Sequence, residues 1–151
     1  MGVTGRGNAG EAAILNALVQ RDFDVFLPFG EGHPFDLVVL AEDRFARIQC
    51  KTAWPSGGCL LFNSHTTDHG HGIRSYVGLA DVFGVYFPPD RSVFLVPVGD
   101  VPTHEGRLRL VPAQNNQKRG VRLADDYLID RWTPGALSEL VRKPAPVKLA
   151  A

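Results

Sequence analysis

The sequence predicts a mixed α/β fold: a single domain of 151 residues in which helices flank one mixed β-sheet. A segment near the N-terminus has apolar residues at helical spacing, and several short segments rich in Val, Leu, Ile and Phe follow it. Glycine and proline separate those segments, and no internal repeat or shift in composition marks a second domain.

The helix is expected over residues 10–21, with Asn8 or Gly10 as its N-cap. Its apolar residues recur on one face: Ile14, Leu15, Leu18 and Val19. Residues 1–9 are rich in glycine, and residues from 143 onward are rich in proline and alanine. We therefore expect flexible ends, near residues 1–7 and 143–151.

Strands are expected where apolar residues concentrate between turn signals: 23–29, 35–40, 45–52, 59–63, 82–87, 92–98 and 108–111. A short second helix is expected at 123–130. The polar segments 65–72 and 114–120 predict loops, and Trp54 and Trp132 are interpreted as packing residues.

The bulk composition, with 44% apolar residues, is typical of a globular protein. Sixteen basic and 16 acidic residues give no basic excess of the kind that non-specific DNA-binding proteins carry. Cys50 and Cys59 lack CxxC spacing, which indicates buried thiols in a reducing compartment. We see no signal peptide and no apolar run of membrane-spanning length, so we expect a cytoplasmic protein without a membrane partner.

Residues 35–52 are predicted to form a hairpin whose turn lies between Glu42 and Asp43. Paired residues then have numbers that sum to 85, so that Asp36 faces Gln49 on the same side of the sheet. Lys51 lies two positions beyond Gln49 and shares that side. A carboxylate, an amide and an ammonium group therefore converge at one end of the hairpin. The opposite side is apolar core: Leu37, Val39, Ala46, Ile48 and Cys50.

A divalent cation gives a reason for these polar groups to meet, because burying them unpaired is costly. Asp36 offers a carboxylate, Gln49 a side-chain carbonyl oxygen, and Cys50 a backbone carbonyl oxygen, and Mg²⁺ prefers such ligands. Lys51 beside the metal would orient or deprotonate an attacking water, or stabilise charge on the phosphorane. The alternative is an exposed hairpin end with a salt bridge.

Glu11 lies one helical turn before Ile14 and Leu15, on the same apolar stripe. An acid on that stripe points toward the sheet, where it would join the metal site through a water. The alternative is that Glu11 stabilises the positive end of the helix dipole.

Pro34-Phe35-Asp36 followed by Gln49-Cys50-Lys51 resembles the P-D…(D/E)-x-K signature of the PD-(D/E)xK nuclease superfamily, and Gly10-Glu11 resembles its helix glutamate. The layout of residues 5–53 is similar to that of the small homing endonucleases encoded in group I introns and, more loosely, of Holliday junction resolvases. The resemblance extends along most of the chain, through residues 76, 81–86, 93–98 and 115–118.

The resemblance implies a restriction-endonuclease-like core and a metal-dependent endonuclease that hydrolyses phosphodiester bonds of double-stranded DNA. It places Glu11, Asp36 and Gln49 at the metal, beside the Cys50 carbonyl, and makes Lys51 the catalytic lysine. The implied cofactor is Mg²⁺ or Mn²⁺. The implied assembly is a homo-oligomer, a dimer or tetramer, whose paired active sites cut both strands at a specific site.

Two positions depart from the superfamily pattern. Phe35 separates Pro34 from Asp36, and Gln49 stands where the second acid is usual. Glutamine keeps one oxygen ligand but removes a negative charge, which weakens metal binding. The intron-encoded subgroup resembles this chain in using glutamine.

Other polar residues are candidates for DNA contacts: Arg74, Tyr76, Asn115, Asn116, Gln117, Lys118 and Arg119. Arginine and lysine would meet phosphates, and asparagine and glutamine can bond to adenine edges; the alternative is a solvated surface. One loop holds metal-ligand side chains close together: His65, Asp68, His69 and His71. No cysteine or distant histidine completes a zinc spacing, so a DNA-facing loop is favoured over a structural zinc site.

Three functions stay open at this point. They are a homing-type endonuclease, a Holliday junction resolvase that recognises branch shape, and a DNA-binding module without activity. The neutral charge balance argues against a resolvase, which should carry a strongly basic surface. A binding module would tolerate the loss of Lys51.

Overall fold

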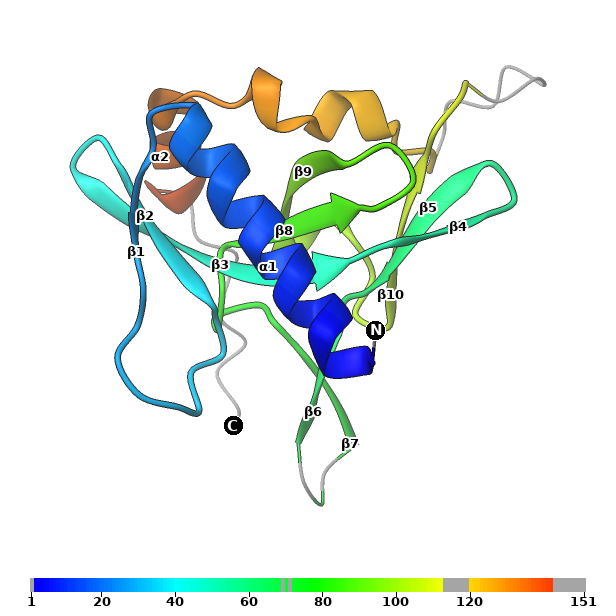
Figure 1. The fold of residues 1–151 in the computed structure, drawn as a ribbon, viewed down its shortest axis with the longest axis horizontal. Helices are drawn as coiled ribbons and strands as arrows, with labels where there is room; N and C mark the ends of the chain where they lie inside the picture. The colour runs from blue at the N-terminus through cyan, green and yellow to red at the C-terminus, as the bar shows by residue number, and fades with distance from the viewer. Residues whose placement is uncertain (1, 69, 71, 113–119, 143–151) are drawn as a thin grey trace.

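The computed structural model describes residues 2–68, 70, 72–112 and 120–142. A long helix, α1 (Val3–Gln20), lies across a five-stranded sheet with the strand order β1-β2-β3-β8-β9 (Figure 1). The strands of this sheet are β1 (Asp24–Phe26), β2 (Leu37–Ala41), β3 (Arg44–Thr52), β8 (Val82–Phe87) and β9 (Ser92–Pro97). Only the β3–β8 pair is parallel within it, so the predicted mixed α/β class is confirmed.

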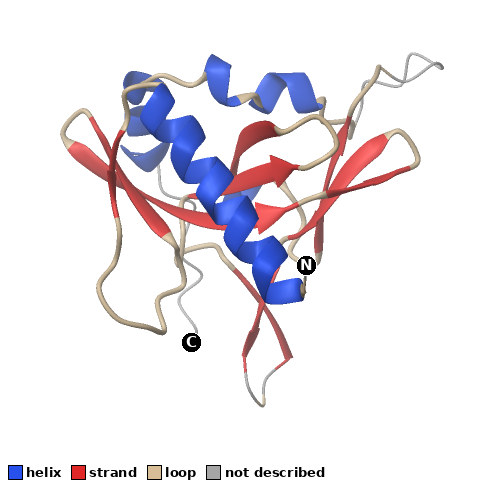
Figure 2. Cartoon of the chain, in the orientation of Figure 1, coloured by secondary structure: helices blue, strands red, loops and turns tan. Residues whose placement is uncertain are grey.

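A second, three-stranded sheet has the order β10-β5-β4. Its strands are β4 (Trp54–Ser56), β5 (Cys59–Asn63) and β10 (Glu105–Arg109). The segment expected to be a loop at 65–72 instead contributes a hairpin, β6 (His65–Asp68) and β7 (Gly72–Ser75), which projects from the body of the protein (Figure 2). A 3₁₀ turn, η1 (Val98–Asp100), follows β9.

α1 begins at Val3, well before the predicted start at residue 10, and Gly2 rather than Asn8 or Gly10 is its N-cap. Propagating an existing helix adds one hydrogen bond for each residue ordered, so the glycines of this end weaken the helix without stopping it. The expectation of a flexible lead-in is therefore wrong for residues 3–9, which are helical.

The C-terminal part also differs from the prediction. Two 3₁₀ turns, η2 (Ala124–Tyr127) and η3 (Ile129–Arg131), replace the helix expected at 123–130. Leu128 between them is extended and forms a β-bridge with Phe94, which interrupts helical hydrogen bonding.

A helix that was not predicted, α2 (Pro134–Arg142), follows these turns. Thr133 Oγ1 accepts the N–H of Ala136 at 3.1 Å, as a helix-capping side chain does, and Pro134 suits the first helical position. Threonine followed by proline was therefore a usable start signal in the sequence.

Two apolar clusters cover the two faces of the large sheet. The cluster on the α1 face includes Ile14, Leu18, Leu37, Val39, Ile48, Val82, Leu95 and, from α2, Leu137. The cluster on the other face joins β8 and β9 to the small sheet and includes Phe62, Phe83, Val85, Val96 and Leu108. Within the described ranges, no helix combines the length and hydropathy that a membrane crossing needs.

The parallel β3–β8 pair is held at its start by Arg47 and Asp81. The Arg47 backbone N–H donates to Asp81 Oδ2 at 2.8 Å, and the guanidinium donates to both carboxylate oxygens at 3.1 Å. A two-point arginine–carboxylate pair has defined geometry, so it helps to set the register in which β3 reaches the site described next.

Candidate active site

The hairpin of β2 and β3 has the predicted register. Leu40 pairs with Phe45 and Val38 with Arg47, so the numbers of paired residues sum to 85 as expected. The ladder ends at Leu37 and Ile48, and Asp36 lies one residue before β2.

β3 pairs with different strands along its length. Its first part pairs with β2 as far as Ile48, and its second part, from Ile48 to Thr52, pairs with β8 on the other side. Because β2 begins only at Leu37, residues 49–52 have no paired strand on the β2 side within the described part of the chain. This open edge of β3 leaves backbone groups free for other partners.

Asp36 occupies this open edge. Its backbone N–H donates to the Ile48 carbonyl at 2.9 Å, and its Oδ2 accepts the Cys50 backbone N–H at 2.9 Å. The N–H and C=O of one strand residue point to the same edge, so the Cys50 carbonyl faces the Asp36 side as well. Asp36 Oδ1 accepts no hydrogen bond from the described residues, and it is therefore the carboxylate oxygen open to a ligand.

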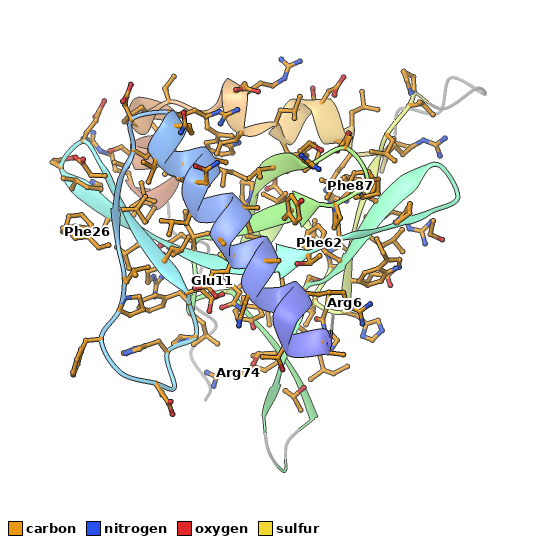
Figure 3. All side chains as sticks on the ribbon, viewed as in Figure 1. Arg6, Glu11, Phe26, Phe62, Arg74 and Phe87 are labelled. Atoms are coloured by element: carbon orange, nitrogen blue, oxygen red, sulfur yellow. The ribbon has the colours of Figure 1, made fainter. Side chains whose placement is uncertain are left out.

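Glu11 reaches the same region from α1. Gly10 lies so close to β3 that a Cβ at this position would overlap Thr52 Oγ1, and Figure 3 shows Glu11 part-way along the helix. Glu11 and Asp36 line one groove of about 390 Å³. Burial raises the pKa of the Glu11 carboxyl, and the negative charge of Asp36 raises it further. The negative charges of Glu11 and Asp36 repel each other, and a cation bound between them would relieve that repulsion.

Lys51 lies over the ring of Tyr76. Lys51 Nζ is 4.7 Å from the ring centroid and donates to the tyrosine hydroxyl oxygen at 3.4 Å. The ring is itself fixed, because Tyr76 is only 7% exposed and packs edge-on against Phe83 at 5.4 Å. Burial lowers the pKa of Lys51, while the negative charge of Asp36 partly offsets that fall. Lys51 is therefore a positioned ammonium group that gives up a proton more readily than a solvated one.

Gln49 has its amide nitrogen 3.5 Å from the Cys50 carbonyl oxygen, at the limit of a hydrogen bond, which leaves Oε1 for a ligand. Burial raises the pKa of the Cys50 thiol, with Asp36 and Glu11 adding to the rise. The thiol therefore stays neutral, and Cys50 offers its backbone carbonyl rather than its sulfur.

These oxygens fit a hard divalent cation: two carboxylates, one side-chain amide and one backbone carbonyl. In the part of the chain that the structure describes, no group of three or more His, Cys, Asp or Glu side chains could hold a metal ion. A cation here thus needs Gln49 and the Cys50 carbonyl in addition to Glu11 and Asp36. Lys51 and Asp36 form no ion pair with described residues, which disfavours the alternative of a simple salt bridge at the hairpin end.

The remaining predicted residues are placed as follows. Tyr76 was expected to face DNA, but it is buried beneath Lys51, since its ring completes the core on that face. No signal in the sequence connected these two residues, because only folding brings them together. Arg74 is exposed on β7, on the projecting hairpin (Figure 3). The other DNA-contact candidates, Asn115, Asn116, Gln117, Lys118 and Arg119, lie outside the described residues.

His65 belongs to the base of the projecting hairpin. One of its ring nitrogens lies 2.8 Å from the His104 carbonyl oxygen, and the two imidazole rings stack with centroids 5.1 Å apart. His69 and His71 lie outside the described residues, so the structure does not test the less favoured alternative of a zinc site in this segment.

Comparison with known proteins identifies the family of this chain. A family model described as PD-(D/E)XK endonuclease matches residues 1–130, which is most of the chain. The chain belongs to this family. It is thus a nuclease by family membership, and its resemblance to PD-(D/E)xK proteins is confirmed.

A solved structure of a bacterial homing endonuclease is similar in fold to this PD-(D/E)XK endonuclease. The TM-score is 0.64 and the sequence identity 17%, over 95% of this chain and 94% of the other. At this identity the likeness shows the fold alone. The sequence has no significant match among curated proteins.

Proposed function

We propose that this PD-(D/E)XK nuclease is a divalent-metal-dependent DNA endonuclease that cuts both strands of a specific site, as homing endonucleases do. The observation that carries the proposal is the open edge of β3. There Asp36, Gln49 and the Cys50 carbonyl lie beside Lys51, and Glu11 approaches from α1. The fold shared with a bacterial homing endonuclease supports the homing type.

In this proposal Glu11, Asp36, Gln49 and the Cys50 carbonyl hold Mg²⁺ or Mn²⁺. When bound, such a cation supplies Lewis-acid activation of the phosphate and of the attacking water. Asp36 has a divided role: Oδ2 holds the backbone of β3 through the Cys50 N–H, and Oδ1 is directed to the ligand. The carboxylate therefore couples the shape of the strand to the binding of the cation.

Lys51 acts on the reacting phosphate. Water adds to phosphorus, the bond from phosphorus to the leaving sugar oxygen breaks, and that oxygen gains a proton. Lys51 Nζ either orients the water or donates to the charged phosphorane, and its lowered pKa lets it give up a proton more readily than a solvated lysine does. The Tyr76 ring and hydroxyl limit the positions that the ammonium can take, which is a positioning role.

The DNA surface in this proposal includes Arg74 on the projecting hairpin, where a guanidinium would meet a phosphate. Residues 115–119 are proposed as a second contact. Two copies of the chain, in a dimer or tetramer, would place one active site on each strand.

The test is cleavage of three DNA substrates: linear duplex, a four-way junction and a plasmid library with randomised inserts. Each is incubated with Mg²⁺, with Mn²⁺ and with EDTA, using the wild type, Asp36→Asn, Lys51→Met and, as a matched exposed acid, Asp43→Asn. Metal-dependent double-strand cuts at a recurring insert, lost in the first two variants and kept in the third, are expected. Cutting of junctions alone would establish a resolvase, and binding without cutting would establish a DNA-binding module.

A further inference from the structure

A groove of about 490 Å³ adjoins the candidate active site. Glu11, Lys51 and Trp54 are among the residues that line it. The groove is continuous with the active site because it shares these two charged residues with it. The N-terminal turns of α1 form one wall and include Arg6.

Trp54 does not behave as the packing residue that the sequence suggested. Its side chain is 44% exposed at the start of β4, whereas Trp132 packs against the core on the α1 face. Trp54 lines this groove together with Cys50 and Thr52 of β3 and with the N-terminal part of α1. An indole left open in a groove beside catalytic groups offers a flat surface on which another ring can stack.

Arg6 adds a positive charge to this groove. Its side chain is exposed, and it forms no ion pair with the residues that the structure describes. A guanidinium can bond to a phosphate at two points or stack on a base. Val3, Ala53 and Pro88 give the remaining wall an apolar character.

We propose that this groove binds one nucleobase of the DNA substrate, unstacked from its neighbours and stacked on Trp54, with Arg6 on an adjacent phosphate. The inference rests on the proposed nuclease function and adds a base-binding subsite to it. The four residue-to-residue steps from Cys50 to Trp54 span at most roughly 13 Å, or about four steps of DNA at 3.4 Å per base pair. The stacked base therefore lies within about four nucleotides of the scissile phosphate.

Taking a base out of the stack costs least at flexible steps and mispaired positions, and stacking on an aromatic side chain offsets that cost. The subsite thus favours target sequences that open readily near the cut. The enzyme would then prefer certain sequences at this position even though no hydrogen bond from the protein recognises the base.

The test follows Trp54 fluorescence in a Trp132→Phe variant, without metal, so that no cleavage takes place. One probe is a single-stranded octamer of deoxyadenylate, and the other is an octamer of the same sugar-phosphate backbone without bases. The base-containing octamer should quench Trp54, and the abasic octamer should bind without quenching. If Trp132→Phe does not fold, the difference in signal between the wild type and Trp54→Phe gives the same measurement.

Affinity, measured by fluorescence anisotropy of end-labelled octamers, supplies the matched controls. Trp54→Leu should bind the deoxyadenylate octamer about 5- to 100-fold more weakly, Trp54→Phe should keep most of the affinity, and both should bind the abasic octamer as the wild type does. Equal quenching by the two octamers, no quenching by either, or an equal loss of affinity for both in Trp54→Leu would overturn the subsite.

The outcome separates this inference from the nuclease proposal. Cleavage of plasmid DNA that persists while Trp54 is not quenched removes the subsite alone, whereas quenching without any cleavage removes the nuclease activity alone. Once a cut site is mapped, DNA with an abasic position within about four nucleotides of the cut should fail to quench Trp54, and an abasic position farther away should leave the quenching unchanged.

Discussion

Asp36 allows the structural and catalytic parts of the site to be tested separately. Its Oδ2 accepts the Cys50 N–H at 2.9 Å, and its charge is the part proposed to bind the cation. Asp36→Ala removes both contributions. Asp36→Asn keeps an oxygen of the same shape to accept the N–H but removes the charge.

The expected loss of unfolding free energy in Asp36→Ala follows from that hydrogen bond. A hydrogen bond to a charged group contributes about 1.5–3 kcal/mol, and relief of the repulsion between Asp36 and Glu11 returns a small part of this. We therefore expect Asp36→Ala to lose about 2 kcal/mol of unfolding free energy. For a domain of this size, that lowers Tm by roughly 4–8 °C. Asp36→Asn should stay within about 2 °C of the wild type.

The assay combines thermal unfolding in EDTA with cleavage in Mg²⁺. Both variants should lose about 100-fold or more of the cleavage rate, as happens when one electrostatic contact to a transition state is removed. Asp43→Asn, which alters an exposed acid 3.7 Å from Arg142, should change neither measurement. The reasoning fails if Asp36→Ala is as stable as the wild type, or if Asp36→Asn cuts DNA at the wild-type rate.

The other predictions concern Lys51, Glu11 and Gly10. Because burial lowers the pKa of Lys51, its protonated form costs folding free energy below that pKa. Lys51→Met should therefore unfold at an equal or higher temperature than the wild type at pH 7, and any such gain in Tm should disappear above about pH 10.4. The same variant should cleave DNA about 100- to 1,000-fold more slowly. The pKa of Glu11 is raised, so its ionised form costs folding free energy at higher pH. Glu11→Gln should gain stability at pH 7, lose that gain below about pH 4, and show a smaller rise in Tm with added Mg²⁺. Gly10→Ala should lose about 1–3 kcal/mol by chemical denaturation, because the new Cβ overlaps Thr52 Oγ1, and Thr52→Ala in the same chain should restore most of it. A Gly10→Ala protein as stable as the wild type would show that α1 does not pack closely on β3.

Much of the β2–β3 hairpin could be predicted because its register depends on residues that are close together in the sequence. β3 alternates apolar Ala46, Ile48 and Cys50 with polar Arg47, Gln49 and Lys51, and the polar residues at 42 and 43 mark the turn, so the register follows from a short stretch of sequence. That register alone brought Asp36 toward Gln49 and Lys51. The apolar stripe of α1 likewise predicted the face that Glu11 shares, although not that the helix begins at Val3.

Contacts between distant segments were not predictable in this way. Tyr76 reaches Lys51 only because the chain between β3 and β8 returns to the sheet. The sequence around either residue does not indicate that it contacts the other. The open edge of β3 depends on how far two neighbouring strands extend, which is decided by packing and not by propensity.

The amino-acid sequence by itself therefore determined the fold class, the hairpin register and the choice of candidate residues for the proposed metal site, because side-chain alternation and turn chemistry act over a few residues. The tertiary structure decided which backbone carbonyl lies at the open edge of β3, which ring the Lys51 ammonium group lies over, and that Trp54 is exposed. These features depend on which surfaces remain uncovered after the sheets and α1 have packed, and that depends on the whole chain.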